Sequence, residues 1–261
     1  MKNFVRPFAI KELKIIPSLV HGISPRHFET ASGEKSALLL GQSGSSGSSP
    51  QHREWFLRSL NIESDEVFLA RQIHGDRVYA LDDVSISADE LAAIEADAIV
   101  TRLTGKPIGI LTADCIPIIV YDTRLHVVGT IHAGRKGTAE NILSKTIRVL
   151  RDAYGSRPEN ILMGMGPGIG GCCYEVDDPC IEPFRQKHKE WASFVKPSSG
   201  DKYQLDLFRA NEEDGLGAGI LRKNIFRSGE CTSCLNESFF SYRREGKTGR
   251  ILTLAMLRRR G

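Results

Sequence analysis

Three residues that can bind a metal ion each stand where a predicted buried strand ends. They are His74 in LARQIHGD, Cys115 in IGILTADCIP and His132 in VVGTIHAG. An apolar run leads into each residue, so we expect rigid backbone to aim the three side chains at a common point. Two imidazoles and one thiolate suit a catalytic Zn²⁺ that keeps its fourth position open. An open position binds water or substrate, which predicts metal-assisted chemistry.

The alternative for each residue taken alone is a packed core side chain, since cysteine is among the most buried residue types. The three residues are also too far apart in sequence for a compact zinc motif, whose ligands lie a few positions apart. The prediction is therefore spatial. If the three residues share an ion, their nitrogen and sulfur atoms must lie within about 4 Å of one another.

A carboxylate, Asp114, directly precedes the cysteine. Neighbours in an extended strand point to opposite faces, so Asp114 and Cys115 share a site only if the strand ends there, as Pro117 suggests. Asp114 would then act as an acid or base near the metal, or hold a ligand histidine from behind. The alternative is a carboxylate that accepts a backbone amide at a turn.

Four basic residues are candidates for binding an anionic substrate. Arg135 and Lys136 lie between His132 and an expected helix start, where backbone amides also attract anions. Arg243 and Arg244 lie in SFFSYRREGKTGR, which we expect to be a strand followed by a basic turn. Both arginines would bind phosphate or carboxylate, and the alternative is a solvated rim.

The six cysteines leave a further pattern to interpret. Cys231 and Cys234 form a CxxC, but no second CxxC stands at the spacing of a zinc ribbon. We therefore expect a structural role for this pair, packing for the adjacent Cys172 and Cys173, and one metal ion per chain. The glycine-rich GMGPGIGGCCYEV contains a proline and opens no helix, so a dinucleotide-binding turn is a poor interpretation.

The composition narrows the classes of protein. The chain has 261 residues, of which 41% are hydrophobic and 26% charged. This composition is sufficient for a sizeable core and does not indicate disorder. A formal net charge of +3 is too small to argue for nucleic acid. The first residues lack the apolar run of a signal peptide, and no apolar stretch approaches a membrane span. We expect a cytoplasmic protein that does not bind membranes, as a monomer or small homo-oligomer.

The hydrophobic pattern predicts one α+β domain over residues 1–261, with sheet covered by helices. Strands dominate the first half beyond the N-terminal region, and two of them are apolar on both faces, as in the centre of a covered sheet. A helix with an N-cap at Thr138 is expected to follow. Expected strands are 66–73, 77–81, 97–101, 108–113, 116–122, 126–133, 159–166, 238–244 and 250–257, with hairpin or edge strands in the first 30 residues, as in 13–24. Expected helices are 50–62, 86–96, 138–155, 179–194 and 205–221. The polar stretch 41–49 is expected to be a loop, either mobile or approaching a ligand.

Taken together, several segments resemble one family. They are QIHG, ADAIVT, TADCIP, HAG-x-x-G, GPGIG-x-x-CYEV, LDL, CT and SYRR-x-G-x-TGR, in that order over about residues 65–257. The chain resembles the YfiH-like family, also called the multicopper polyphenol oxidase or laccase-domain family and described as purine nucleoside phosphorylases. One departure stands out: where the family often has Trp–Arg in HAGWRG, this chain has Arg135–Lys136, so an aromatic side chain is lost there.

The resemblance implies a zinc-dependent phosphorylase of adenosine, inosine, guanosine and methylthioadenosine, with adenosine deaminase activity. It maps the zinc ligands onto His74, Cys115 and His132. It also implies α/β/β/α layers of mixed sheets covered by helices, similar to bacterial toxin deamidases with a Cys–His pair. The substrates would be purine nucleosides and phosphate.

Two other activities remain open. A copper-dependent polyphenol oxidase is suggested by the family's older name, although seven histidines without an HxH pair disfavour a conventional multicopper cluster. A cysteine hydrolase is the other alternative, with His132 activating Cys115. In the phosphorylase, Arg243 or Lys136 would hold phosphate, with Arg135 and Arg244 as further substrate-binding candidates and Asp114 moving a proton.

Overall fold

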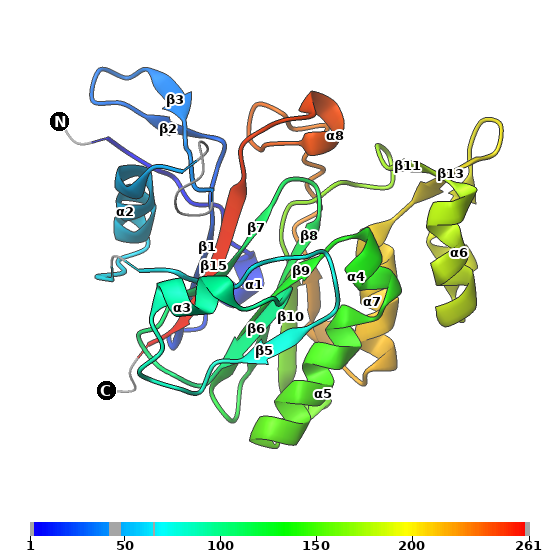
Figure 1. The fold of residues 1–261 in the computed structure, drawn as a ribbon, viewed down its shortest axis with the longest axis horizontal. Coiled ribbons are helices and arrows are strands. Elements are labelled where there is room, and N and C mark those ends of the chain that lie inside the picture. The colour runs from blue at the N-terminus through cyan, green and yellow to red at the C-terminus, as the bar shows by residue number, and fades with distance from the viewer. Residues whose placement is uncertain (1–2, 42–47, 65, 259–261) are drawn as a thin grey trace.

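A computed structural model describes residues 3–41, 48–64 and 66–258 (Figure 1). Most of the expected loop 41–49 lies outside these residues. Strands are β1 (Leu19–Ile23), β2 (His27–Glu29), β3 (Lys35–Ala37), β4 (Phe68–Leu69), β5 (Val78–Ala80), β6 (Ala98–Thr101), β7 (Ile108–Thr112), β8 (Ile116–Asp122), β9 (Val127–Ala133), β10 (Ile161–Met165), β11 (Glu175–Asp177), β12 (Val195–Pro197), β13 (Lys202–Leu205), β14 (Ile225–Arg227) and β15 (Ile251–Leu257). Helices are α1 (Lys11–Lys14), α2 (Pro50–Ser59), α3 (Ala88–Ala93), α4 (Arg135–Ala139), α5 (Ile142–Tyr154), α6 (Asp178–Lys187), α7 (Leu207–Gly217) and α8 (Tyr242–Glu245), with short 3-10 turns at Pro158–Asn160, Trp191–Ser193 and Arg222–Asn224.

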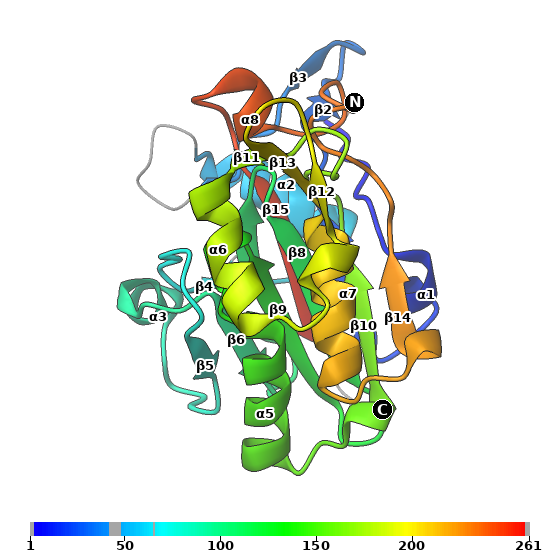
Figure 2. The ribbon, with the colours of Figure 1, turned by 90° about the vertical axis from the view of Figure 1, so that its right-hand side faces the viewer.

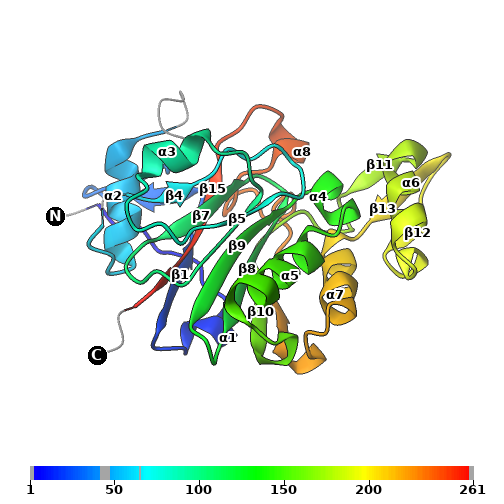
Figure 3. The ribbon, with the colours of Figure 1, turned by 60° about the horizontal axis from the view of Figure 1, so that its bottom comes forward.

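Two mixed sheets pack face to face. The larger has the order β14-β10-β8-β9-β6-β5 and the smaller the order β1-β15-β7-β4. Helices α5 and α7 cover the outer face of the larger sheet, whereas α2 lies on the far side of the smaller one (Figure 3). The α+β fold with α/β/β/α layers is thus confirmed. Among the described residues, no helix is long and apolar enough to cross a membrane.

The alternation of side chains along the strands produces these layers. In β8, Ile118 and Val120 pack toward the helices, while Ile119 packs between the two sheets. In β15, Ala255 faces the inter-sheet core, while Leu254 faces α2. Successive strand residues point to opposite faces, so a strand inside a four-layer fold must be apolar at every position. This is why the central strands read as continuous apolar runs.

One short bend carries the chain directly from the smaller sheet to the larger one. β7 belongs to the smaller sheet and β8 to the larger, and only residues 113–115 connect them. β9 then returns antiparallel to β8, with His132 opposite Pro117. Cys115 therefore lies on the link between the two sheets, next to the end of β9. Figure 2 shows β8 and β9 side by side behind the helices of the outer layer.

The helix expected over 138–155 does not begin where it was predicted to begin. Two helices, α4 and α5, occupy the segment, and Asn141 between them adopts a left-handed conformation with φ 58°. Thr138 lies inside α4, and the N-cap position belongs to Gly134. The polar residues before the apolar stripe fold as a separate short helix because Asn tolerates the left-handed backbone that separates the two.

Three expected strands differ from the structure. In 238–244, Phe239 and Phe240 are buried in the inter-sheet core, and helix α8 follows because the Ser241 side chain accepts the N–H of Arg244. At the N-terminus, β1 is an edge strand of the smaller sheet, as expected, but residues 11–14 form α1. The expected strand 66–73 is shortened to β4, so His74 lies on a loop. In each place the alternation of apolar residues was too short to separate a helix or loop from a strand.

A buried histidine makes the stability of this fold dependent on pH. His21 in β1 accepts the backbone N–H of Ile10, the N-cap of α1, at 3.0 Å. Burial lowers the pKa of His21 from 6.5 to about 4. The folded state therefore favours the neutral ring. The contribution of this ring to stability is complete above pH 6.5, and this contribution is lost as pH falls toward 4.

We expect His21 to lower the free energy of unfolding by up to about 3 kcal/mol as pH falls from 6.5 to 4. His21→Leu should lower the free energy of unfolding at pH 7, because Ile10 loses its acceptor, and should flatten its decline between pH 6.5 and 4. Urea unfolding at several pH values measures both effects, with the partly exposed His27→Ala as control. Equal slopes in the wild type and His21→Leu would contradict the assignment.

Candidate metal centre and active-site cavity

The structure brings His74, Cys115 and His132 together. One ligand atom from each lies within 4.8 Å of the other two, a wider bound than the spread of about 4 Å expected for a tetrahedral ion. The two imidazole rings meet edge to face, with centroids 4.7 Å apart and planes at 85°. Three segments from different parts of the chain therefore present two nitrogens and a sulfur to one point.

A buried carboxylate, Asp97, organises this point. Its side chain is 0% exposed and accepts four hydrogen bonds. One comes from His132 Nδ1 at 2.7 Å, and three come from the backbone N–H groups of residues 73–75 at 2.8–3.2 Å. Since an ionised carboxylate only accepts, His132 must donate from Nδ1, which leaves Nε2 free to bind a metal. This carboxylate–histidine pairing is the usual support of a metal-binding imidazole.

The charge on Asp97 is maintained by its donors. Burial by itself raises the pKa of this carboxyl, but the hydrogen bonds from His132 and from the backbone N–H groups of Gly75 and Ile73 lower it below its usual value overall. A buried charge is tolerated only when it is paired and hydrogen-bonded in this way. Sequence reasoning missed Asp97, although it opens the ADAIVT segment.

The loop that carries His74 is fixed from two sides. The Gln72 side-chain amide pairs with both backbone groups of Leu111 in β7, at 2.7 and 2.8 Å. The backbone of His74 has φ 58°, a left-handed conformation that is uncommon for residues other than glycine. Such backbone persists only where the surroundings over-determine it, here through the hydrogen bonds to Asp97.

Cys115 and His132 form a charged pair in the metal-free protein. Burial raises the pKa of the Cys115 thiol, yet the charge and hydrogen bond of His132, with a hydrogen bond from His74, lower it from 9.0 to about 6. Burial lowers the pKa of His132, yet Cys115 and Asp97 raise it to about 9. The sulfur is therefore a thiolate near neutral pH, the form that binds metals and attacks electrophiles.

The donor set fits zinc. A thiolate, a histidine with its tautomer fixed by a carboxylate, and a second histidine make three protein ligands and leave a fourth direction toward the cavity. A His₂Cys set also suits a single copper ion. In the part of the chain that the structure describes, only His74 and His132 among the histidines lie in a group of metal-binding side chains, fewer than a conventional multicopper cluster uses.

Asp114 holds backbone in place instead of holding a histidine. Its Oδ1 accepts the Thr232 hydroxyl at 2.6 Å and its Oδ2 accepts the N–H of Arg243 at 2.6 Å. Its φ of 89° shows that the strand does end here, as expected from Pro117. The expectation that Asp114 supports a ligand histidine is wrong, because Asp97 does so. With both oxygens engaged, Asp114 is suited to positioning the Arg243 segment.

A cavity of about 750 Å³ opens above the three ligands. It gathers residues from the β7–β8 bend, from α4 and from α8. Its lining includes all the candidate site residues except Arg244: His74, Asp114, Cys115, His132, Arg135, Lys136 and Arg243, together with Ile73, Leu111, Thr112, Ala113, Ile169, Tyr174, Leu207, Tyr242 and Arg250. Arg244 instead donates from Nη1 to the Ser233 carbonyl at 2.9 Å.

The cavity combines cationic and aromatic side chains. Arg135, Lys136, Arg243 and Arg250 supply positive charge, and the Arg243 guanidinium lies 5.1 Å from the centroid of the Tyr174 ring. Sequence reasoning missed Arg250, Tyr174 and Tyr242. The CYEV and SYRR-x-G-x-TGR segments that the chain shares with its family were the available signals for all three.

Four of the five cysteines outside this centre also come together. The sulfurs of Cys172, Cys173, Cys231 and Cys234 all lie within 4.8 Å of one another. The two pairs are therefore not independent of each other, because two turns far apart in sequence meet in space. Sequence spacing alone carries no information on that meeting.

The family model described as "Multi-copper polyphenol oxidoreductase laccase" matches residues 22–258. The chain belongs to this family. It is 36% identical over 201 residues to adenosine deaminase RL5 from an unknown prokaryotic organism, covering 74% of this chain and 76% of the relative. It is 32% identical to purine nucleoside phosphorylase YfiH of Escherichia coli, covering 81% and 83%.

Solved structures of the family have the same fold. The crystal structure of hypothetical protein YfiH from Bacillus licheniformis superimposes with a TM-score of 0.83 at 30% identity, covering 92% of this chain and 93% of the other. The curated relatives named above are nucleoside-processing enzymes. Because this chain is similar to them in sequence and fold, the comparison supports an enzyme of the same broad kind.

Gly134 provides a test of the metal centre that removes no ligand. A Cβ on Gly134 would lie 2.9 Å from Cys115 Sγ and 3.5 Å from a carbon of the His74 ring. Gly134→Ala should therefore displace the thiolate and lower zinc affinity about 10- to 100-fold, the range seen when the support of a ligand is lost. Competition with a chromogenic chelator measures the affinity.

Gly217→Ala is the matched control, since its Cβ would meet nothing within 4 Å. Its zinc affinity should equal that of the wild type. Wild-type affinity in a folded Gly134→Ala variant would show that Cys115 is not a ligand at this point.

Proposed function

We propose that this chain is a zinc-dependent purine nucleoside phosphorylase that also deaminates adenosine, with adenosine, inosine, guanosine and methylthioadenosine as substrates. One observation carries the proposal: His74, Cys115 and His132 converge at a cavity that also holds four cationic side chains. A cavity of about 750 Å³ has room for a nucleoside beside a phosphate ion. The names of the relatives agree with this chemistry.

The basic side chains of the cavity are assigned to inorganic phosphate. Arg243 and Lys136 come from α8 and α4 and both line the cavity. A guanidinium binds phosphate oxygens through two parallel hydrogen bonds, and an ammonium adds a compact charge. Arg135 and Arg250 complete the positive lining. We leave Arg244 out of the substrate site because its guanidinium is bound to Ser233 outside the lining.

The aromatic side chains are assigned to the purine. Tyr174 and Tyr242 line the same cavity, and a planar base stacks on an aromatic ring at a favourable distance. Tyr174 and Tyr242 offer a stacking surface in a chain that has Arg135 where the family often has tryptophan. Arg243, packed on Tyr174, is thereby oriented between the base and the phosphate subsite.

In phosphorolysis, a phosphate oxygen forms a bond to the anomeric carbon of the ribose while the bond from that carbon to the purine nitrogen breaks. The electron pair of the broken bond leaves with the purine, which takes up a proton, and the products are ribose 1-phosphate and the free base. His74, Cys115 and His132 would hold a zinc ion, which would supply a Lewis acid at this cavity. Arg243 and Lys136 orient the phosphate, and Asp114 keeps the Arg243 backbone against the cavity.

A cysteine hydrolase is the second candidate, and a specific observation favours it. Cys115 is paired with His132, which lowers the thiol pKa to about 6, and Asp97 orients the imidazole. This is the arrangement of an activated nucleophile. A copper oxidase of phenols is the third, since the His₂Cys set also accepts copper.

Arg243→Ala tests the phosphate subsite. Loss of a charge-assisted hydrogen bond of about 1.5–3 kcal/mol should raise KM for phosphate about 10- to 100-fold. The backbone N–H that binds Asp114 is retained in this variant. Initial rates of inosine phosphorolysis at varied phosphate give KM, and Arg222→Ala, whose side chain forms an exposed ion pair with Glu212, is the control. An unchanged KM for phosphate would remove Arg243 from the subsite.

His74→Ala separates the metal enzyme from the hydrolase. If zinc is the catalyst, this variant should lose the ion of this centre, and its activity should fall about 100-fold or more, because two ligands hold zinc poorly. A chelator should abolish phosphate-dependent cleavage of inosine, and added zinc should restore it. The surface variant His27→Ala should keep both.

Other outcomes point elsewhere. Full activity in a metal-free preparation would eliminate the zinc mechanism. A stable acyl adduct on Cys115, with His74→Ala still active, would establish the hydrolase. Restoration by copper and not by zinc, with phenol oxidation, would establish the oxidase.

A further inference from the structure

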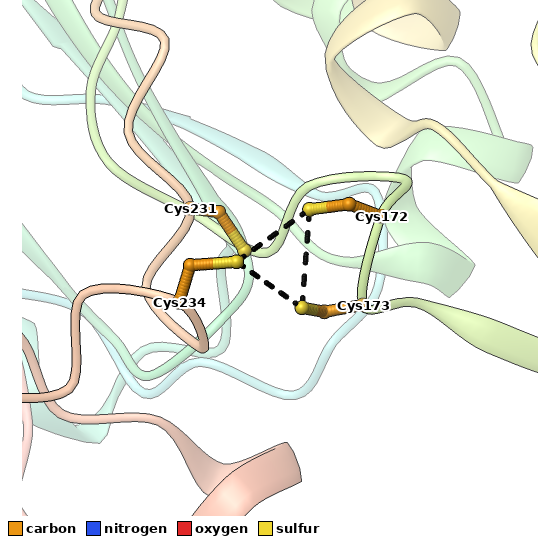
Figure 4. Close-up of side chains that lie close together, drawn as sticks. All are labelled: Cys172, Cys173, Cys231 and Cys234. Atoms are coloured by element: carbon orange, nitrogen blue, oxygen red, sulfur yellow. Dashed lines mark hydrogen bonds between the residues drawn. The ribbon is translucent and has the colours of Figure 1, made fainter.

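Four cysteine sulfurs meet at a second point, apart from the active-site centre (Figure 4). Cys172 and Cys173 come from the loop before β11, and Cys231 and Cys234 come from the loop after β14. In the close-up all four sulfurs point inward toward one another. All six cysteines of the chain are free thiols in this structure, so these four are available as ligands.

Two tight turns bring the sulfurs to the same side. The N–H of Cys173 donates to the Gly170 carbonyl at 2.9 Å, which curls the first loop. Adjacent cysteines would diverge in an extended strand, but on this turn both face the same point. The N–H of Leu235 donates to the Cys231 carbonyl at 2.9 Å, and this helical turn places residues three apart on one side.

The spacing of the sulfurs matches the coordination shell of one ion. The Sγ atoms of Cys172 and Cys173 are 3.8 Å apart, those of Cys172 and Cys234 are 3.7 Å apart, and those of Cys173 and Cys234 are 3.4 Å apart. Zinc–sulfur bonds of about 2.3 Å in a tetrahedron place the sulfurs about 3.8 Å from one another. A disulfide would need about 2.05 Å.

A backbone donor also reaches one of the four sulfurs. The N–H of Gly170 donates to Cys231 Sγ at 3.2 Å. Backbone donors on a metal-binding sulfur are the kind of contact that orients ligands from behind.

The first loop lines the active-site cavity through Ile169 and Tyr174, and the second loop pairs with the first. Gly168 pairs with Cys231 as an isolated bridge, and the N–H of Thr232 donates to the Gly168 carbonyl at 3.0 Å. Thr232 then donates its hydroxyl to Asp114, and Ile169 donates its N–H to the Asp114 carbonyl at 2.7 Å. A link between the loops therefore fixes the backbone that surrounds Asp114.

We propose that Cys172, Cys173, Cys231 and Cys234 bind one structural zinc ion that joins the 168–174 loop to the 230–235 loop. The four thiols lose their protons when zinc binds, and no oxidation is involved. Four protein ligands complete the tetrahedron, so this ion takes no substrate. The chain then carries two zinc ions of different kinds, one closed by four thiolates and one open to the cavity.

Metal analysis of the full-length protein, purified with reductant and without added metal, tests the proposal. The wild type should contain two zinc ions per chain. The double variant Cys172→Ser/Cys234→Ser should contain one, and His74→Ala should contain one from the other site. Cys180→Ser is the control, because Cys180 is a free cysteine outside both groups, and it should retain two.

Cobalt substitution identifies which ligands hold each ion. Cobalt in the wild type should give the intense visible bands of a tetrahedral all-sulfur site, and His74→Ala should keep them. The double variant should lose them while retaining the weaker spectrum of the His₂Cys site. Because these readouts do not involve activity, the second site can stand or fall independently of the proposed phosphorylase.

If the double variant fails to fold, titration of the wild type with a mercurial decides the question. Zinc should be released as four thiols react, and the melting temperature should fall with that release. Equal zinc content in the wild type and the double variant would overturn the proposal. A disulfide among these cysteines in the purified protein, detected by alkylation and mass spectrometry, would also overturn it, as would bound iron with a visible spectrum.

Discussion

The active-site geometry depends on one buried carboxylate. Asp97 directly precedes β6 and binds two other segments to that strand. These segments are the end of β9, bound through His132, and the loop at 73–75, bound through three amides. Removing such a carboxylate would leave buried donors without a partner, which costs far more than an ordinary surface contact. The left-handed backbone at His74 is affordable only because these hydrogen bonds hold it.

The second constraint is the passage between the two sheets. Residues 113–115 leave the smaller sheet and enter the larger one, so their direction is fixed by rigid strands on both sides. Cys115 follows Asp114, whose φ of 89° turns the chain, and both carboxylate oxygens of Asp114 are engaged by Thr232 and Arg243. The thiolate is therefore aimed by backbone geometry, and the segment that carries Arg243 is aimed by the same residue.

The cysteine cluster extends this network outward. Thr232 stands one residue after Cys231, and Ile169 stands three residues before Cys172, so both contacts to Asp114 come from the two loops that the cysteines join. A metal ion at the cluster would thus stabilise the wall of the cavity without entering it. This arrangement separates a catalytic role, which requires an open ligand position, from a structural role, which requires a closed one.

The sequence by itself determined the α+β class, with sheet covered by helices, and the trio of His74, Cys115 and His132, while the α/β/β/α layers followed from the family resemblance. It did so because strands that are apolar on both faces, and ligands that follow apolar runs, are local patterns. β4 ends at Leu69, however, so His74 lies on a loop and not at a strand end. Only the tertiary structure decided which carboxylate supports His132, since Asp97 and Asp114 look alike in sequence and differ in the donors that reach them. It also decided that Arg243 lines the cavity and Arg244 does not, because α8 forms where a strand was expected. The meeting of Cys172 and Cys173 with Cys231 and Cys234 depends on the packing of two distant loops, which spacing along the chain does not encode.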